Sequence, residues 1–170
     1  MDISIRLARP ADALAMAEIY SLSWEAAYKN IIPPEYIRRK NLTNPALFQR
    51  IITDDNNRQY IIECNGKAVG IMCVDVPQEN TVAIINDNGI DDSFYELHGI
   101  YLHPDHYRKG IGTVALDFAF KKAREAGKCN MIVWVFEENI GSISFYQNCG
   151  FHADGARKIY DCGKKWNALE

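Results

Sequence analysis

The sequence has no C-x-x-C pair and no long apolar run, and each absence excludes a class of protein. The five cysteines are odd in number and scattered, so neither a disulfide framework nor a zinc site is predicted, and we expect reduced thiols in a cytoplasmic protein. No apolar segment reaches the length that spans a bilayer, so no membrane partner is expected. The formal net charge of −3 supplies no basic field for nucleic acid.

Repeats, low-complexity tracts and Pro/Gly/Ser-rich linkers are also missing, so residues 1–170 are predicted to form a single domain. Asn65-Gly66 predicts a hairpin, because both residue types tolerate positive φ. Strands are expected at 3–7, 59–64, 67–76, 95–102 and 131–136, with one more after 151 and one near 166–169. One helix is expected to begin at Pro10, and three others are expected at 35–53, 110–126 and 140–148. Residues 77–92 are predicted to hold a short strand at 82–85 or a long loop. The order strand, helix, strand from 95 to 136 predicts a crossover between parallel strands.

The loop between Leu102 and the helix of 110–126 has the composition of an anion site. A helix N-terminus offers free amides and the positive end of the helix dipole. Gly110 and Gly112 let the backbone approach an anion, and Arg108 and Lys109 add positive charge. A Walker loop needs a lysine after its last glycine, and a dinucleotide fold needs a third glycine at position 115, which is alanine here. Neither nucleotide-binding motif is favoured, and a plain turn with two glycines stays an alternative.

Two motifs resemble those of the GNAT acetyltransferase superfamily. The family pattern Arg/Gln-x-x-Gly-x-Gly/Ala follows a central strand, and this chain has Glu96-Leu97-His98-Gly99-Ile100-Tyr101-Leu102, Pro104 and Arg108-Lys109-Gly110-Ile111-Gly112. One departure is Tyr107, which stands at the Arg/Gln position. The second family pattern, Asn-x-x-Ser/Ala-x-x-Phe-Tyr-x-x-x-Gly-Phe, is similar to Asn139, Ser142, Phe145-Tyr146 and Gly150-Phe151. Residues 6–28 also resemble a family opening, so the resemblance covers nearly the whole chain.

The resemblance implies an α+β fold with three αβα layers. Its mixed, mostly antiparallel twisted sheet would have about six to seven strands, helices on both faces and two splayed central parallel strands. Acetyl-CoA would be the co-substrate, without a metal, and its acetyl group would pass to a primary amine of a small molecule by direct attack in a ternary complex. A protein or peptide N-acetyltransferase and a non-catalytic acyl-CoA-binding module remain alternatives. The identity of the amine is left open, and a homodimer is compatible with the resemblance.

The resemblance also assigns residues to the cofactor. Splaying would leave backbone groups of Ile100, Tyr101 and Leu102 free for the pantetheine arm, with Gly99 marking a bulge. The pyrophosphate would lie on the segment formed by Tyr107, Arg108, Lys109, Gly110, Ile111, Gly112 and Thr113. Asn139 and Ser142 would contact the cofactor from the second motif, and Asn139 is also predicted to cap its helix.

Acyl transfer needs a proton donor, a proton acceptor and a site for the developing oxyanion. Tyr146, in the Phe-Tyr position of the family, is the predicted donor to the thiolate, although a core aromatic is the alternative. Glu96 is the predicted general base; His98, on the same strand face, and a water are the other candidates. An amide near Leu102 would hold the oxyanion. By family analogy, the acceptor side would be lined by Trp24, Tyr28 and the segment to Tyr36.

Overall fold

The computed structural model describes residues 1–88, 93–162 and 165–169. Five strands form one sheet in the order β1 (Ile3–Leu7), β2 (Gln59–Cys64), β3 (Lys67–Asp75), β4 (Phe94–Leu102) and β5 (Asn130–Val133). Neighbours from β1 to β4 are antiparallel, whereas β4 and β5 are parallel. A second, antiparallel sheet has the order β6 (Val135–Phe136), β8 (Lys165–Leu169) and β7 (Arg157–Asp161). The α+β fold with a mixed, mostly antiparallel sheet is confirmed, with the strands divided between two sheets.

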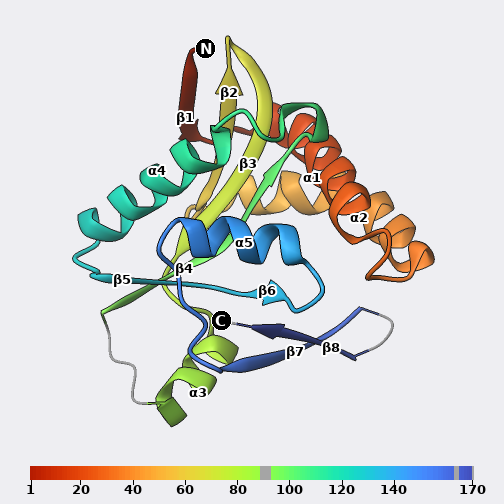
Figure 1. Cartoon of the computed structure of the whole chain (residues 1–170). Coiled ribbons are helices and arrows are strands. Elements are labelled where there is room, and N and C mark those ends of the chain that lie inside the picture. Colours follow the sequence, from red (N-terminus) through yellow and green to blue (C-terminus); the bar gives the residue numbers. More distant parts are fainter. Residues whose placement is uncertain (89–92, 163–164, 170) are drawn as a thin grey trace.

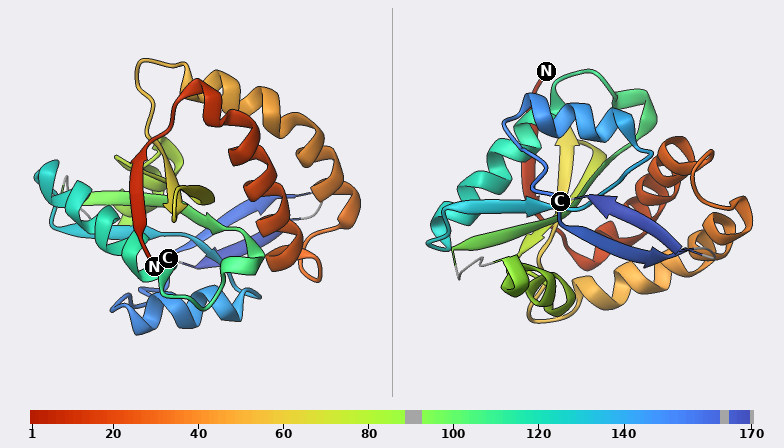
Figure 2. Two further views of the ribbon diagram at one scale, coloured as in Figure 1. Left: turned by 90° about the horizontal axis from the view of Figure 1, so that it is seen from above. Right: turned by 60° about the horizontal axis from the view of Figure 1, so that its bottom comes forward.

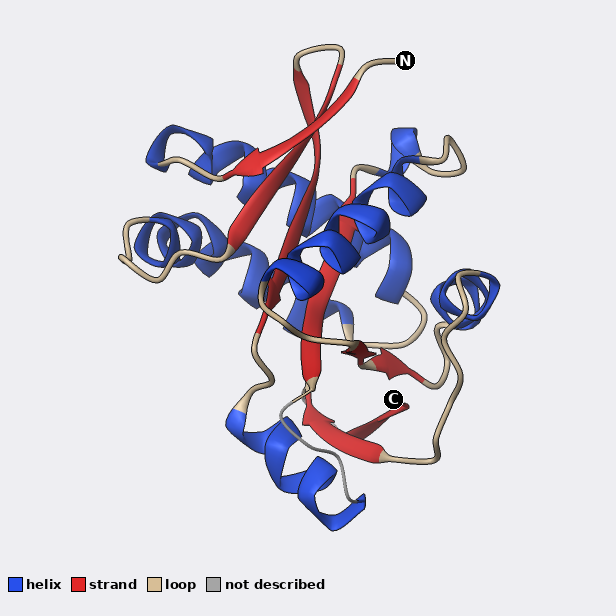
Figure 3. Ribbon diagram, turned by 90° about the vertical axis from the view of Figure 1, so that its left-hand side faces the viewer, coloured by secondary structure: helices blue, strands red, loops and turns tan. Residues whose placement is uncertain are grey.

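Helices cover both faces of the five-stranded sheet (Figures 1 and 3). After a short 3-10 turn, η1 (Pro10–Asp12), α1 (Ala13–Tyr28) and α2 (Pro34–Ile52) pack on one face; α4 (Ile111–Glu125) lies on the other, beside α5 (Ile140–Asn148). The view from above separates the two helix layers, with the sheet between them (Figure 2). Successive strand residues point to opposite faces, so Ile61 and Ile71 join the α1–α2 core, whereas Ile62 and Met72 join the α4 core.

Local sequence explains most of these boundaries. The hairpin between β2 and β3 turns at Asn65 (φ 51°) and Gly66 (φ 75°), the positive-φ pair that the Asn-Gly dipeptide predicts. Helix α4 buries Ile111, Ala115 and Ala119, which recur at helical spacing on one face. It ends before Gly127, whose φ of 73° is the left-handed conformation of a helix C-terminal glycine.

The prediction of a strand or a long loop within residues 77–92 is wrong, because Glu79–Asn88 form helix α3. β-Branched and aliphatic residues at 81–85 favour a strand by propensity, but tertiary packing overrides it. In the first turn of this helix Thr81 is fully buried and faces the protein interior, whereas Val82 is exposed to solvent. The helix packs against β7, below the start of β4 (Figure 1). Residues 89–92 lie outside the described part of the chain.

The two parallel strands separate halfway along their length. β4 and β5 pair from Phe94 opposite Asn130 to Leu97 opposite Val133. Trp134 then stands outside both strands, and β6 pairs with β8 instead. The predicted strand at 131–136 is thus interrupted at Trp134. Beyond Leu97, β4 is paired only with β3 in the described residues, and the splayed arrangement is confirmed.

The predicted bulge lies at the point where the strands separate. Cys73 pairs with Gly99 and Val74 pairs with Leu97, so His98 is the extra residue on β4. Gly99 is required here by a close approach: a Cβ at this position would lie 2.6 Å from Cε2 of the Tyr101 ring. The bulge lets the ring of Tyr101 fold back over the strand.

Candidate active site

The predicted anion loop forms a turn that opens α4. A second 3-10 turn, η2 (Pro104–His106), precedes it; then Arg108 has φ 60° and Gly110, the N-cap residue of α4, has φ 78°. The amides of Ile111, Gly112 and Thr113 begin the helix, and within the described residues they have no backbone acceptor. The side chains of Arg108 and Lys109 are exposed beside them. The turn thus presents free amides, a helix dipole and two cations in one place.

The two predicted cofactor segments meet at the start of α4. A Cβ on Gly112 would lie 3.2 Å from Cζ of Phe145 on α5, so the glycine allows the two helices to approach closely. At the start of α5, the side chain of Asn139 accepts a hydrogen bond from the Ser142 amide at 3.2 Å. The predicted N-cap role of Asn139 is confirmed.

Tyr146 lies in the core beneath this junction. Its side chain is buried and packs between Phe145 and Phe151, with ring centroids 5.1 and 5.4 Å away. Burial raises the pKa of the Tyr146 phenol well above its ordinary value, and Tyr101 adds to the shift. The phenol therefore stays protonated at neutral pH, which is the state that a proton donor needs.

Glu96 and His98 are brought together on β4. The Glu96 carboxylate is 2% exposed and accepts a hydrogen bond from the Gln78 amide at 2.8 Å. Its other oxygen lies 3.5 Å from Nδ1 of His98. Burial lowers the pKa of His98, while the charges of Glu96 and Asp75 act in the opposite direction. The arrangement favours a neutral imidazole next to a carboxylate.

A cavity of about 270 Å³, called here the aromatic pocket, adjoins the point where β4 and β5 separate. Its walls include Leu97 and Trp134 from that point, as well as Glu96 and His98. The other lining residues are Tyr20, Trp24, Tyr28, Tyr36, Lys40, Gln78, Tyr101, Phe136, Tyr160, Asp161 and Cys162. Trp24, Tyr28 and Tyr36 thus line one cavity, and their place on the acceptor side stays a prediction.

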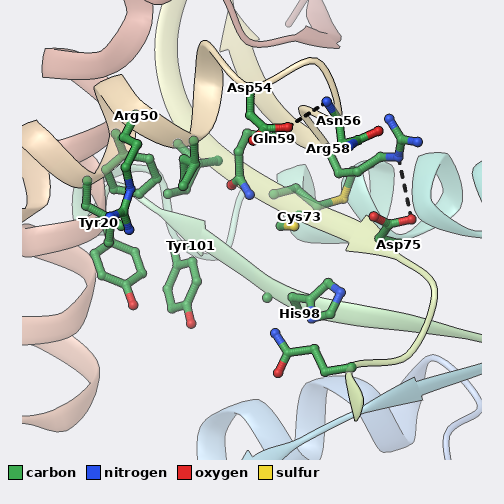
Figure 4. Close-up of a pocket in the computed structure, with 17 residues that line it drawn as sticks. Tyr20, Arg50, Asp54, Asn56, Arg58, Gln59, Cys73, Asp75, His98 and Tyr101 are labelled. Atoms are coloured by element: carbon green, nitrogen blue, oxygen red, sulfur yellow. Dashed lines mark hydrogen bonds and ion pairs between the residues drawn. The ribbon is translucent and has the colours of Figure 1, made fainter. Parts of the chain in front are cut away.

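A larger cavity of about 600 Å³ lies on the α2 side of the sheet (Figure 4). It shares Tyr20 and Tyr101 with the aromatic pocket, and their rings stack edge to face at 4.6 Å. Asp75 lies here, 3.5 Å from Nε of Arg58, so its charge is already paired. Asp75 and Glu96 thus line different cavities.

Sequence reasoning missed a buried polar group behind the aromatic pocket. Oγ1 of Thr81, on α3, accepts from Nε1 of Trp134 at 3.1 Å and from Nζ of Lys158 at 3.0 Å. Lys158 is 5% exposed and lies over the rings of Trp134 and Tyr160. Burial lowers its pKa, and the charge of Glu96 opposes the shift. No sequence signal joined these residues, because α3 was not predicted.

The described residues contain no group of His, Cys, Asp and Glu side chains arranged to hold a metal ion. Among the helices in the part of the chain that the structure describes, none has the length and apolar character to cross a bilayer.

Comparison with known proteins gives a consistent family. A model described as "Acetyltransferase (GNAT) family" matches residues 16–151. The L-amino acid N-acyltransferase MnaT of Escherichia coli is 30% identical over 155 residues, which are 88% of this chain and 79% of that protein. An uncharacterized N-acetyltransferase of Methanocaldococcus jannaschii, MJ1207, is 32% identical over 104 residues. That match covers 61% of this chain and 43% of MJ1207.

The fold is also found among solved structures. The PaiA N-acetyltransferase from Thermoplasma acidophilum, in complex with coenzyme A, superimposes with a TM-score of 0.75 and 20% sequence identity. The match covers 100% of this chain and 99% of that one. At this identity the likeness shows a shared fold.

Proposed function

Because the chain belongs to the GNAT acetyltransferase family, we propose that it transfers the acetyl group of acetyl-CoA to a primary amine of a small molecule. The observation that carries the proposal is the aromatic pocket, which adjoins the separated strands and has Glu96 in its wall. Its volume of about 270 Å³ is at the small end for ligand pockets. MnaT, by its name, acts on L-amino acids, which is a substrate class of fitting size.

The cofactor arm would bind along the free edge of β4. Backbone groups of Ile100, Tyr101 and Leu102 that do not face β3 need partners, and the amides of the pantetheine arm resemble peptide bonds. The diphosphate would lie on the loop from Tyr107 to Thr113, with Asn139 and Ser142 beside the arm. In this arrangement the thioester would lie beside β4 at the boundary of the aromatic pocket, whose wall includes Tyr101.

Each chemical requirement of the proposed reaction would be met by a group of this site. Acetyl-CoA supplies the activated acetyl group. The pair formed by Glu96 and His98 would take the proton that the amine must lose, directly or through a water, because an alkylammonium with a pKa of about 10 is not a nucleophile. An amide near Leu102 would stabilise the negative charge on the carbonyl oxygen during direct attack. Tyr146, held protonated by burial, would donate its proton to the departing thiolate.

A thiol-release assay with Tyr146→Phe tests the assignment. We expect kcat to fall by about 100-fold or more, since a positioned acid contributes on that order. Affinity for acetyl-CoA, measured by titration calorimetry, should change by less than about threefold, because the ring is retained. Tyr95→Phe is the matched control: it removes a buried phenol on the paired half of β4 and should leave kcat unchanged. Equal kcat in wild type and Tyr146→Phe would remove the acid role.

The same assay separates the alternatives. A panel of small amines and N-terminal peptides distinguishes a small-molecule enzyme from a peptide enzyme by their kcat/KM values. Tight acetyl-CoA binding without thiol release on any amine would favour the non-catalytic binding module. We also propose that residues 1–170 form one domain that works in the cytoplasm, where the five cysteines, all free in the structure, stay reduced.

A further inference from the structure

Lys40 gives the aromatic pocket a positive charge on its α2 wall. The side chain is half-buried and lines the pocket together with Glu96. Its Nζ lies 4.7 Å from the centroid of the Trp24 ring and 5.4 Å from that of Tyr20. The ammonium is thus held against two aromatic faces and kept at the pocket.

Among the residues that the structure describes, Lys40 has no counter-ion. In the described part of the chain, no carboxylate lies within 4 Å of its Nζ and no acceptor forms a hydrogen bond with it. Two other cations near the cavities have partners, because Arg58 lies near Asp75 and Lys158 donates to Thr81, whereas Arg50 of the larger cavity is exposed to solvent. Burial lowers the pKa of Lys40, as expected for a cation removed from water without a carboxylate partner. Ring faces compensate only part of that cost.

A second unused donor lies beside it. The indole Nε1 of Trp24 is buried and lacks a hydrogen-bond partner in the described structure. It lies near enough to the Tyr101 hydroxyl to oppose the rise in that residue's pKa, yet outside hydrogen-bond geometry. A buried donor is normally satisfied, so the unpartnered Trp24 indole beside the half-buried Lys40 ammonium points to a ligand that brings oxygen atoms.

We propose that Lys40 binds a carboxylate of the acceptor, so that the enzyme selects amines that also carry a carboxylate, such as amino acids, over simple amines. This inference rests on the proposed acetyl transfer at the same pocket. Lys40 and Glu96 supply opposite charges to one cavity, and an amino acid carries both complementary charges. A simple alkylamine would leave the Lys40 ammonium unpaired, and a diamine would bring a second positive charge toward it. Lys40 therefore both favours one acceptor class and disfavours the other.

Three matched acceptors test the selectivity: L-methionine, its amide, and 3-(methylthio)propylamine, which lacks the carboxylate. In the thiol-release assay, the wild type should give a kcat/KM for L-methionine at least about 10-fold above those for the other two. Lys40→Met should reduce kcat/KM for L-methionine by about 10- to 100-fold, the range for a hydrogen bond to a charged group. Its activity on 3-(methylthio)propylamine should change by less than about threefold. Lys40→Arg should restore a large part of the preference.

Controls separate this inference from the proposed function. Lys29→Met removes an exposed lysine at the end of α1, outside the pocket, and should leave all three acceptors unchanged. Intrinsic fluorescence follows binding without turnover, because Trp24 and Trp134 both line the pocket. L-Methionine should quench the wild type saturably and Lys40→Met much more weakly.

The outcomes are distinct. If no amine is acetylated, the proposed function fails, and the fluorescence titration alone then decides whether Lys40 binds a carboxylate. If amines are acetylated but the wild type prefers the amide or the decarboxylated amine, the role of Lys40 is overturned. A Lys40→Met variant that loses activity equally on all three acceptors would overturn it as well, because a purely structural role predicts that result.

Discussion

Thr113 is an exposed residue in the first turn of α4, where the stability of the fold and the binding of coenzyme A make opposite demands on charge. A carboxylate at a helix N-terminus interacts favourably with the helix dipole. The same carboxylate would repel a diphosphate that lies on the amides of that turn. We therefore expect Thr113→Asp to leave the melting temperature equal or slightly higher while raising the Kd for acetyl-CoA by about 10-fold.

The isosteric and neutral Thr113→Asn is the control, and it should bind acetyl-CoA like the wild type. Titration calorimetry and a thermal melt on the three proteins give both readouts. Equal affinity of Thr113→Asp and Thr113→Asn would mean that the diphosphate lies elsewhere.

The positive charge of Lys158 acts on His98, which together with Glu96 forms the pair proposed to take the proton from the amine. Burial is the main cause of the lowered pKa of His98, and the positive charge of Lys158 lowers it further. Lys158→Met should therefore raise this pKa. If the neutral imidazole of His98 is the member of the Glu96–His98 pair that takes the proton, activity is lost as pH falls through the pKa of His98, and the acid limb of the kcat profile should move to higher pH in the variant. His98→Gln supplies the comparison. In a protein that carries His98→Gln, adding Lys158→Met should leave the pH profile of kcat unchanged.

If Lys158→Met melts like the wild type and the acid limb of its kcat profile lies at the same pH, His98 does not take the proton. A fall in melting temperature alone would report the lost hydrogen bond to Thr81 and not the charge.

At the scale of elements, Arg6 joins three segments near the start of the chain. From β1, its Nη1 lies 2.7 Å from Asp12 of the first 3-10 turn, and its Nη2 lies 2.8 Å from Glu63 of β2. The hydrogen bond from Arg6 lowers the pKa of Asp12. We expect Arg6→Gln to lower the free energy of unfolding at pH 7 by about 1 kcal/mol, since the groups are only partly buried.

The sign of the pH dependence follows from Asp12. A carboxyl whose pKa is lower in the folded state stabilises the fold above its unfolded pKa, near 4, and loses that contribution as pH falls through the folded value. Urea titrations should therefore show the gap between wild type and Arg6→Gln at pH 7 and a smaller gap below pH 4. A gap that stays constant would mean that the ion pair with Asp12 adds nothing.

Element boundaries were predictable where local chemistry alone decides them. Asn65-Gly66 specifies its turn, and the apolar stripe of α4 specifies its buried face. Helix α3 was not predictable, because its start is held by distant groups: Gln78 donates to Glu96 and Thr81 bonds with residues far along the chain. Trp134 reads as the middle of an apolar strand, yet it leaves the sheet to reach Thr81.

The candidate site also contains residues that local sequence predicts and residues that only the fold brings together. Motifs predict the loop from Tyr107 to Thr113 and the residues of α5 as cofactor-binding, since each of these segments is local in sequence. Lys40 and Lys158 carried no signal, because each acquires its environment from elements brought together only by the fold. The role proposed for Lys40 depends on its burial and its missing counter-ion, and that proposed for Lys158 depends on its charge near His98, neither of which a sequence pattern shows.

Across the whole molecule, the two sheets diverge where the cofactor arm would bind. β4 is central by position, yet beyond Leu97 one edge of it is unpaired in the described residues. An unpaired strand edge can pair with another chain and promote aggregation, and here a ligand would cover it. The homodimer stays a prediction that light scattering can test, with and without acetyl-CoA.

Hydrogen exchange measures that edge directly. In the free protein, peptides covering Gly99–Leu102 should exchange faster than those of β2, which is paired on both sides. Saturating acetyl-CoA should protect 99–102 together with 108–113, because one ligand would bond with the strand edge and the loop. ADP, which carries the diphosphate but no pantetheine arm, should protect the loop alone. Protection of the loop by both ligands without protection of β4 by acetyl-CoA would place the arm outside the gap, and the β4 edge would then need another partner.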